Sequence, residues 1–386
     1  MHIGFITSHF PFHNAKSVGG IGTSIKNLGD ELVIAGHKVT VFVYNQEADE
    51  KFIEAGIHIQ KIKNIRFKGL SWWLTRKKIQ HEICKTSKFD KIDIVEAPDW
   101  EGITAFIKLP CPIVIRENGS DTYFCYLDKR PVKKWNKFQE KWALRQANAI
   151  IAVSSFTGKV TNKIFGIDKP FAVIPNGINI DMFFPEPIAA SHKTILYFGG
   201  IIRKKGLLEI PHYFNIVNEK FPEVNLILVG ADMPDKISGS PSTFKMMELL
   251  FSLTAQQKVA FKGSVPYHEI KKYINAATVC IFPSYAEALP VSWLEAMAME
   301  KAIVASDIGW SNEIIDDGKD GFKVNPAHHK DFAERIIRLL EDEPLRHQIE
   351  KNARKKISSK FSSKITANQT IECYKEIIKN ARFKRI

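Results

Sequence analysis

The chain has 386 residues, of which 45% are hydrophobic and 25% are charged. These proportions are ordinary for a globular protein, and a length above about 250–300 residues predicts two domains. No stretch approaches the ~18 consecutive apolar residues of a membrane-spanning helix, and Met1–Thr7 resembles a β-strand rather than a secretory signal. The five cysteines are scattered without metal-ligand spacing, which favours a reducing cytoplasm over a disulfide framework.

Positive charge is concentrated in two segments of the first half. Lysine and arginine exceed aspartate and glutamate by 55 − 42 = 13, an excess that favours anionic partners. Residues 61–91 contain ten basic and two acidic side chains, and residues 129–145 contain seven and one. Tryptophans among these lysines are typical of a surface that contacts an anionic membrane, although two amphipathic helices with solvated lysines would show the same pattern. Nucleic acid is not expected as a partner, because no recognition motif accompanies the charge.

Short apolar segments of strand length alternate with longer amphipathic segments along the chain. This alternation predicts doubly wound parallel sheets, which bind ligands at the carboxyl ends of their strands. A linker that begins at Asp181 divides the pattern into two α/β halves of about six strands each, residues 1–187 and 188–365, with a ligand cleft between them. The expected strands are His2–Thr7, Val39–Tyr44, Ile92–Val95, Ile113–Ile115, Ala149–Val153, Ala172–Ile174, Thr194–Phe198, Val224–Val229, Val259–Phe261, Val279–Phe282, Ile303–Ala305 and Gly321–Val324. Helices are expected at Ile25–Ala35, Trp135–Ala147 and Ser363–Ile386.

Glycines follow the first expected strand of each half. Gly19 and Gly20 precede a helix, whose N-terminus can bind an anion, although a plain tight turn would also use glycine. In the second half, Gly199 and Gly200 are followed by three cations, Arg203–Lys205. Free amides and cations together suit a diphosphate. A solvated basic loop is the alternative.

Two glutamates eight positions apart, Glu287 and Glu295, flank the start of a predicted helix whose first turn contains Pro290. A carboxylate in the loop can accept hydrogen bonds from sugar hydroxyls, and one inside the helix can bind the two hydroxyls of a ribose. Glu295 lies among apolar residues, so its carboxylate needs a partner. Solvent-facing or structurally paired glutamates would show the same spacing.

Polar residues also follow the strand expected at Ile113–Ile115, where Asn118 and Asp121 occur. This is the edge at which α/β proteins bind ligands. A structural loop is the alternative interpretation.

Together these segments resemble the retaining glycosyltransferase family 4, whose members have the GT-B fold. The Glu-x7-Glu signature of that family appears as Glu287 and Glu295. The resemblance implies two Rossmann-like domains with an interdomain cleft, and a C-terminal helix, about residues 366–386, that crosses back to the N-terminal, acceptor-binding domain. The other matching stretches are Gly19–Gly20, Gly36–Val39, Ile174–Ile178, Lys205–Gly206, Pro283–Ser284, Leu289–Pro290, Leu294–Ala298 and Glu313–Gly321.

The resemblance implies transfer of a sugar from a nucleotide diphosphate sugar to a hydroxyl of a glycan or lipid-linked acceptor, in the assembly of surface polysaccharide, lipopolysaccharide or another glycan. Glu287 would contact the donor sugar, Glu295 the ribose and Lys205 the phosphates, without a metal or a separate cofactor. Gly19 and Gly20 would let their loop close on the phosphates or the acceptor. The other donor-binding residues that the resemblance implies are Gly199, Gly200, Ala288, Leu289, Pro290 and Val291.

Two positions depart from the family pattern. Gly200 replaces a common arginine, and we expect Arg203 to reach the same phosphate. Asn118 replaces a common histidine; its amide can orient the donor but cannot take a proton, so a reaction that needs a base would be slow or would use Asp121 or His13.

Two other functions fit the same architecture. A nucleotide-sugar epimerase is one, and Glu287, Glu295 and Lys205 argue against it. A catalytically inactive sugar-nucleotide-binding protein is the other, and Asn118 gives it some weight.

Because residues 61–91 and 129–145 lie in the half that resembles the acceptor domain, we expect them to dock a peripheral enzyme on the inner face of the cell membrane.

Overall fold

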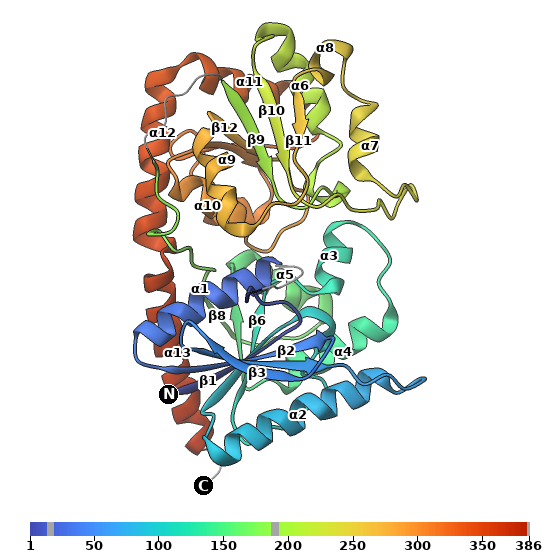
Figure 1. Ribbon diagram of the computed structural model, residues 1–386, viewed down its shortest axis with the longest axis vertical. Coiled ribbons are helices and arrows are strands. Elements are labelled where there is room, and N and C mark those ends of the chain that lie inside the picture. Colours follow the sequence, from blue (N-terminus) through green and yellow to red (C-terminus); the bar gives the residue numbers. More distant parts are fainter. Residues whose placement is uncertain (14–18, 187–192, 384–386) are drawn as a thin grey trace. The chain divides into compact units, whose positions relative to one another are not determined.

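The computed structural model describes residues 1–13, 19–186 and 193–383. The chain forms two compact units, Met1–Gly177 with Ser362–Ile386, and Ile178–Phe361 (Figure 1). The first boundary therefore lies at residue 177 and not at the expected 187. The physical reason is that the Ile178 amide donates to the Phe361 carbonyl (2.8 Å) and the Arg354 guanidinium donates to the Phe183 carbonyl (2.9 Å), so this segment is bonded into the second unit.

The first unit contains an eight-stranded sheet in the order β3-β4-β2-β1-β5-β6-β7-β8, parallel except for β3. Its strands are β1 (His2–Thr7), β2 (Lys38–Gln46), β3 (Glu50–Glu54), β4 (Ile57–Lys63), β5 (Ile94–Pro98), β6 (Ile113–Glu117), β7 (Ala149–Ala152) and β8 (Phe171–Val173). The expectation of six strands was wrong for β3 and β4. These two form an antiparallel hairpin at the edge of the sheet, where β3 is largely exposed and lacks the apolar run of a buried strand.

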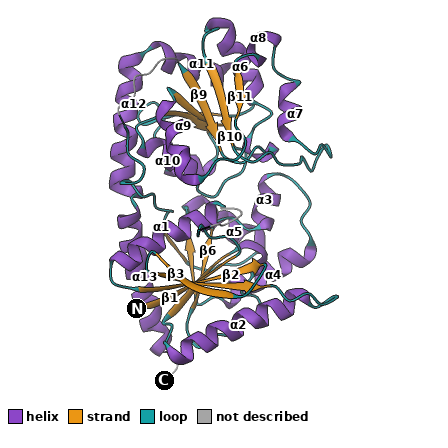
Figure 2. Cartoon of the chain, viewed as in Figure 1, coloured by secondary structure: helices purple, strands orange, loops and turns teal. Residues whose placement is uncertain are grey.

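Helices flank this sheet (Figure 2). They are α1 (Gly20–Ile34), α2 (Ser71–Phe89), η1 (Trp100–Gly102), α3 (Asp121–Leu127), α4 (Lys134–Gln146), α5 (Ser155–Phe165) and α13 (Ser363–Phe383). The last helix packs against α1 and contributes Ala367, Ile371 and Tyr374 to the core around β1 and β2. The expected return of the C-terminal helix to the first unit is confirmed.

A buried ionic network joins α13 to the sheet. Arg116 on β6 pairs with Glu96 on β5 (Nε to Oε1, 2.8 Å), and the Tyr374 hydroxyl donates to the other oxygen of Glu96 (2.6 Å). Each of these side chains is at least nine-tenths buried, so each charge depends on the others for its partners.

The second unit contains a six-stranded parallel sheet in the order β11-β10-β9-β12-β13-β14, and all six expected strands are confirmed. Its strands are β9 (Thr194–Phe198), β10 (Asn225–Val229), β11 (Val259–Phe261), β12 (Val279–Phe282), β13 (Ala302–Ser306) and β14 (Phe322–Val324). Its helices are η2 (Arg203–Lys205), α6 (Ile210–Lys220), α7 (Thr243–Glu248), α8 (Leu253–Gln256), η3 (Tyr267–Glu269), α9 (Ile270–Ala276), α10 (Val291–Ala298), η4 (Gly309–Glu313), α11 (His329–Glu341), α12 (Glu343–Lys356) and the π-helix η5 (Ile357–Phe361).

The strand order of each sheet reverses direction beside its first strand. In the second unit the chain runs from β9 outward to β10 and β11, and then returns to the other side of β9 with β12. Such a switch point leaves a crevice beyond the carboxyl ends of the two central strands, where doubly wound folds bind ligands. The segments that follow β9 and β12 therefore meet at this edge of the sheet.

Candidate functional site

The turn that follows β9 requires glycine. Gly206 has a φ of +70°, and a Cβ at this position would lie 1.9 Å from the carbonyl oxygen of Pro283, directly after β12. The Tyr285 amide donates to the Lys204 carbonyl (2.8 Å). These close contacts between two backbones fix Lys205, at the end of η2, beside the loop that follows β12.

Lys205 and Glu287 form an ion pair at this edge of the sheet. The Lys205 Nζ lies 3.0 Å from Glu287 Oε1, and the Ser284 hydroxyl donates to the same oxygen (3.0 Å). The Lys205 side chain is 23% exposed and the Glu287 side chain 11%, so both charges are partly removed from water and interact more strongly than a surface pair would. The structure thus brings together the residues predicted for the donor phosphates and the donor sugar.

Helix α10 begins immediately after the loop that contains Glu287. Pro290 is its N-cap rather than part of the first turn, and it supplies no side-chain hydrogen bond to the first amides of the helix. Ala288 and Leu289 lie buried in the loop, and Val291 is the first helical residue. The positive end of the helix dipole is therefore at the loop predicted to bind the diphosphate.

Glu295 lies inside α10 and is 5% exposed. The Tyr267 hydroxyl donates to Glu295 Oε1 (2.7 Å). Burial raises the pKa of Glu295 to about 7, while the hydrogen bond from Tyr267 and the charge of Lys205 act in the opposite direction. The carboxylate thus has the partner that the sequence required, although Tyr267 was not predicted.

Arg203 is held by a carboxylate of its own unit. Its Nε and Nη2 donate to the two oxygens of Asp235 at 2.8 and 2.7 Å. The Ser238 amide and hydroxyl donate to Asp235 as well, and together these donors hold the Asp235 pKa far below its usual range. The bidentate pair leaves Arg203 less available for a phosphate than the sequence suggested.

Gly199 and Gly200 begin the turn after β9. Gly199 has a φ of +140°, which favours glycine, whereas a Cβ at Gly200 would meet no atom within 4 Å. The backbone at Gly200 is therefore open for a ligand to approach.

In the first unit, Asn118 and Asp121 follow β6. The Asn118 amide donates to Asp99 Oδ1 (3.0 Å), and the Asn118 side-chain oxygen accepts from Asn176 (3.4 Å). Asp121 begins α3, and its carboxylate accepts from the Asn136 side chain (3.0 Å). Asn118 is half-buried and its side chain makes only long contacts, so it can reorient toward a ligand more readily than Asp121.

The glycines at the start of α1 are open. Gly19 is the N-cap and Gly20 the first helical residue; both are exposed, and a Cβ at either would meet no atom within 4 Å. Gly22 differs, because its Cβ would lie 2.5 Å from the His9 carbonyl oxygen. Close packing therefore accounts for a glycine at position 22 but not at positions 19 and 20. Residues 14–18, which precede this motif, lie outside the described part of the chain. His13 is exposed, and its amide donates to Glu54 (3.0 Å).

Three buried carboxyl groups close to Asn118 or Asp121 were not predicted from the sequence. Burial raises the pKa of Asp99 to about 8, of Glu117 to about 9 and of Glu140 to about 7, and repulsion from a neighbouring carboxylate adds to each of these shifts. Within the part of the chain described, Asp99 Oδ2 and Glu117 Oε2 lack a hydrogen-bond partner. Part of this cluster could have been found from the sequence. Asp99 follows β5 and Glu117 ends β6, and both positions lie at the carboxyl edge of the sheet, where ligands bind.

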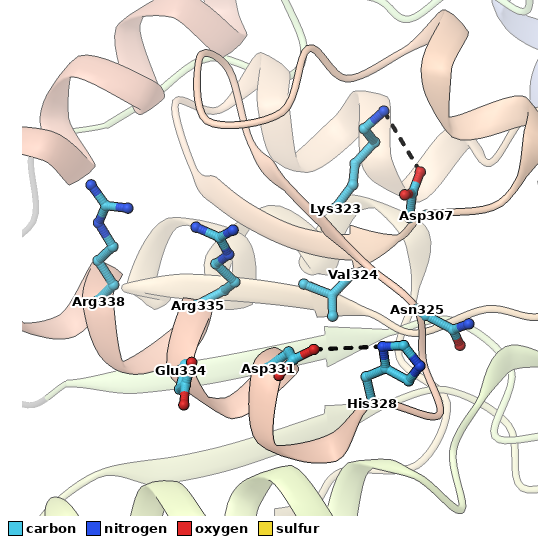
Figure 3. A pocket seen from close by; sticks show the side chains of 9 residues that line it. All are labelled: Asp307, Lys323, Val324, Asn325, His328, Asp331, Glu334, Arg335 and Arg338. Carbon is cyan, nitrogen blue, oxygen red and sulfur yellow. Dashed lines mark ion pairs between the residues drawn. The ribbon is translucent and has the colours of Figure 1, made fainter.

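A hollow of about 700 Å³ also opens on the second unit, beside β13, β14 and α11 (Figure 3). Two ion pairs lie within it, Lys323 with Asp307 (3.7 Å) and His328 with Asp331 (3.5 Å). It contains three acidic and three basic side chains besides His328, so it lacks the positive excess that a diphosphate needs, and none of the predicted donor-binding residues lines it. The lining residues are Asp307, Lys323, Val324, Asn325, His328, Asp331, Glu334, Arg335 and Arg338.

Comparison with known protein families agrees with this geometry. The model described as "Glycosyl transferases group 1" matches residues 179–356, and the model described as "Glycosyltransferase Family 4" matches residues 18–182. Two Rossmann-like sheets with these matches define a glycosyltransferase enzyme of the GT-B fold. The chain belongs to the family 4 type of the group 1 glycosyltransferases.

Individual relatives cover much of the chain at low identity. An uncharacterized glycosyltransferase, MJ1607 of Methanocaldococcus jannaschii, is 26% identical over 97% of this chain and 98% of its own length. The N,N'-diacetylbacillosaminyl-diphospho-undecaprenol alpha-1,3-N-acetylgalactosaminyltransferase of Campylobacter jejuni is 29% identical over 62% of this chain and 63% of its own. Among solved structures, Anabaena Alr3699/HepE in complex with UDP-glucose superposes with a TM-score of 0.74 at 18% identity, covering 97% of this chain and 100% of that one, which establishes the fold alone.

Proposed function

We propose that the second unit binds a nucleotide diphosphate sugar, and that the enzyme transfers the sugar to a hydroxyl of a glycan or lipid-linked acceptor bound by the first unit. The observation that carries this proposal is the ion pair between Lys205 and Glu287, with its 3.0 Å separation at the switch point of the sheet. A cation for a diphosphate and a carboxylate for sugar hydroxyls stand there side by side. The Anabaena relative, whose structure contains UDP-glucose, supports a donor of this class.

The diphosphate, the sugar and the ribose of the donor each have a counterpart in this unit. Lys205 and the first amides of α10 would stabilise the negative charge that develops on the departing diphosphate. Glu287 would accept hydrogen bonds from the donor sugar, and Glu295 would accept them from the ribose. Arg203, held by Asp235, would support the turn rather than contact the phosphate.

We propose that the reaction retains the anomeric configuration, with attack on the face from which the diphosphate leaves. The departing phosphate would then take the proton of the acceptor hydroxyl, so that no side-chain base is needed. This route suits a chain with Asn118 in place of histidine, because an amide can orient the donor but cannot accept the proton.

The function is tested by incubating the enzyme with UDP-, GDP- and ADP-sugars, with and without lipid-linked or glycan acceptors, and measuring release of the free nucleoside diphosphate. A transferase releases it mainly when an acceptor is present, and NMR of the product reports the anomeric configuration. Glu287→Gln should lower the rate by more than about 100-fold. An altered sugar still attached to its nucleotide would indicate an epimerase, and donor binding without turnover would indicate an inactive binding protein.

We further propose that the first unit docks on the inner face of an anionic membrane to reach a lipid-linked acceptor. Support comes from five rings of α2, α4 and the intervening chain, here named the aromatic surface, whose successive centroids lie 5.2–6.4 Å apart. Three of them remain 37–48% exposed, which is unusual for tryptophan and phenylalanine that only fill a core. The aromatic surface consists of Trp72, Phe106, Trp135, Phe138 and Trp142.

Four lysines alternate with the rings of this aromatic surface along α4 and its N-cap. Lys133 and Lys134 are exposed, and neither forms an ion pair with a described residue, nor do Lys137 and Lys141. Such rings beside unpaired lysines suit the boundary between lipid headgroups and acyl chains. None of the described helices has both the length and the apolar character needed to cross a bilayer. The Campylobacter relative, named for an undecaprenol-linked acceptor, supports a lipid-linked substrate.

A further inference from the structure

Tyr267 reaches the buried carboxylate of Glu295 from a different part of the sheet. It begins η3, after β11, whereas Glu295 lies on α10, after β12. Its hydroxyl donates to Glu295 Oε1 at 2.7 Å, and its ring packs against Phe183 with centroids 5.7 Å apart. A ring contact and a short hydrogen bond hold the phenol in one position.

The protonation of Glu295 decides what it can bind. An ionised carboxylate is purely an acceptor and can receive both hydroxyls of a ribose, whereas a protonated one presents a donor on one of its oxygens. Burial at 5% exposure favours the protonated form. A donor such as the Tyr267 hydroxyl favours the ionised form and also fixes the plane of the carboxylate.

Few other charged groups act on Glu295. Lys205 is the cation that lowers its pKa together with Tyr267. Helix α12 packs against α10, but its Arg354 is engaged by the Ala298 carbonyl and lies 4.0 Å from Glu300. β13 has no charged residue, Lys360 of η5 is exposed, and neither is among the groups that shift the pKa of Glu295. Tyr267 and Lys205 are therefore the groups that keep Glu295 in its ionised form.

We propose that Tyr267 is a positioning residue of the donor site: its hydroxyl orients Glu295 and keeps it ionised, so that the carboxylate accepts the two hydroxyls of the donor ribose. This inference rests on the proposed function. It assigns to Tyr267 a role in recognising a ribonucleotide without a direct contact with the nucleotide.

The test compares Tyr267→Phe with Tyr213→Phe, a buried tyrosine of the same unit whose hydroxyl donates to the Pro326 carbonyl (2.8 Å). Calorimetry measures the Kd of UDP, GDP and ADP from pH 5.5 to 9, and of the 2′,3′-dideoxy counterpart of whichever binds. The terminal phosphate titrates near pH 6 in the ribonucleotide and in its dideoxy counterpart alike. Its effect on the Kd therefore cancels when the two are compared.

For the wild type, preference for the ribonucleotide should rise through about pH 7, the pKa of Glu295. Tyr267→Phe should move this midpoint up by about one pH unit or more and weaken ribonucleotide binding about fivefold or more at pH 7, with the dideoxy nucleotide unaffected. Tyr213→Phe should keep the wild-type midpoint.

An unchanged midpoint in Tyr267→Phe, or equal weakening of both nucleotides, would overturn the role of Tyr267 while leaving the proposed function intact. Failure of the wild type to bind any of the three nucleotides would overturn both. Circular dichroism of each variant tests whether it has lost its fold. A variant that binds the dideoxy nucleotide with the wild-type Kd is also folded at the site.

Discussion

The amino group of Lys205 lies 3.0 Å from a carboxylate oxygen of Glu287, and this pair joins the loops that follow β9 and β12. Each residue also neutralises the other in the absence of substrate. A bound diphosphate would compete with Glu287 for the lysine, and the sugar hydroxyls would compete with Lys205 for the carboxylate. Substrate binding would therefore exchange one set of charged hydrogen bonds for another rather than leave a buried charge unpaired.

Lys205→Ala and Arg203→Ala should have different effects although the residues are two positions apart. We expect Lys205→Ala to raise the KM for the donor more than about 30-fold, because a phosphate contact is lost. Arg203→Ala should change that KM less than about threefold and lower stability instead, since its partner Asp235 loses its bidentate donor. Steady-state kinetics and thermal melting distinguish the two. If Arg203→Ala raised the KM for the donor more than Lys205→Ala does, Arg203 and not Lys205 would be the main phosphate ligand.

Gly206→Ala should destabilise the second unit, since the added Cβ would lie 1.9 Å from the Pro283 carbonyl at a φ of +70°. We expect a loss of about 2–4 kcal/mol in the free energy of unfolding, measured in urea. Gly200→Ala is the control: its Cβ meets nothing within 4 Å, so stability should change by less than about 0.5 kcal/mol. Equal losses in both variants would contradict this account of the turn.

Asp99→Asn should stabilise the protein at neutral and alkaline pH. Burial raises the pKa of Asp99 from 3.8 to about 8, so the unfolded chain releases this proton near pH 4 while the folded chain keeps it to about pH 8. The stability of the wild type is therefore lost progressively as the pH rises through that interval. Asparagine removes this loss, and the gain should reach about 1–3 kcal/mol at pH 9.

Urea titrations of Asp99→Asn at pH 5, 7 and 9 measure this gain. The exposed Asp168→Asn serves as control and should follow the wild type. Parallel pH profiles for wild type and Asp99→Asn would show that Asp99 is ionised in the folded protein.

Replacing Trp135 and Phe138 by serine should abolish flotation of the protein with vesicles containing anionic lipid. Both side chains are nearly half exposed, at 48% and 45%, so folding should be little affected. Leu253→Ser, at an 83% exposed site in the second unit, should float like the wild type. Absence of wild-type flotation at low and at physiological salt would rule out the membrane proposal.

We expect EDTA to leave the transfer rate unchanged within about twofold, because Lys205 and the N-terminus of α10 would supply the positive charge that other enzymes take from a metal. The rate is measured with and without EDTA, and with added Mg²⁺ or Mn²⁺. A rate that EDTA removes and a divalent cation restores would contradict a metal-independent reaction.

Most of the fold was predictable because buried parallel strands are continuous apolar runs, as in the expected range Thr194–Phe198, which matches β9 residue for residue. The edge hairpin of β3 and β4 was not predictable, because β3 is mostly polar and depends on pairing with β4 rather than on burial. The domain boundary was misplaced because Asp181 and its neighbours have the composition of a linker. Their attachment to α12 through Arg354 is a tertiary contact that no local pattern encodes.

The candidate site was predictable where a residue type and a spacing both pointed to it, as with Glu287 and Glu295. Partners that arrive from other strands were missed. Tyr267 is separated from Glu295 by a whole strand and a helix, and Asp235 meets Arg203 from the loop after β10. Asp99 was not predicted, because its burial depends on tertiary contacts, among them the packing of η1 against α4, that no local pattern encodes.

The position of α13 has a consequence for the order in which this protein matures on the ribosome. The first unit needs Tyr374 to complete the network of Glu96 and Arg116, so its hydrophobic interior stays unfinished until α13 has been synthesised. The second unit is continuous in sequence and has all its strands much earlier. The later-translated half can therefore reach its native state first, the reverse of the usual N-to-C progression of multidomain chains.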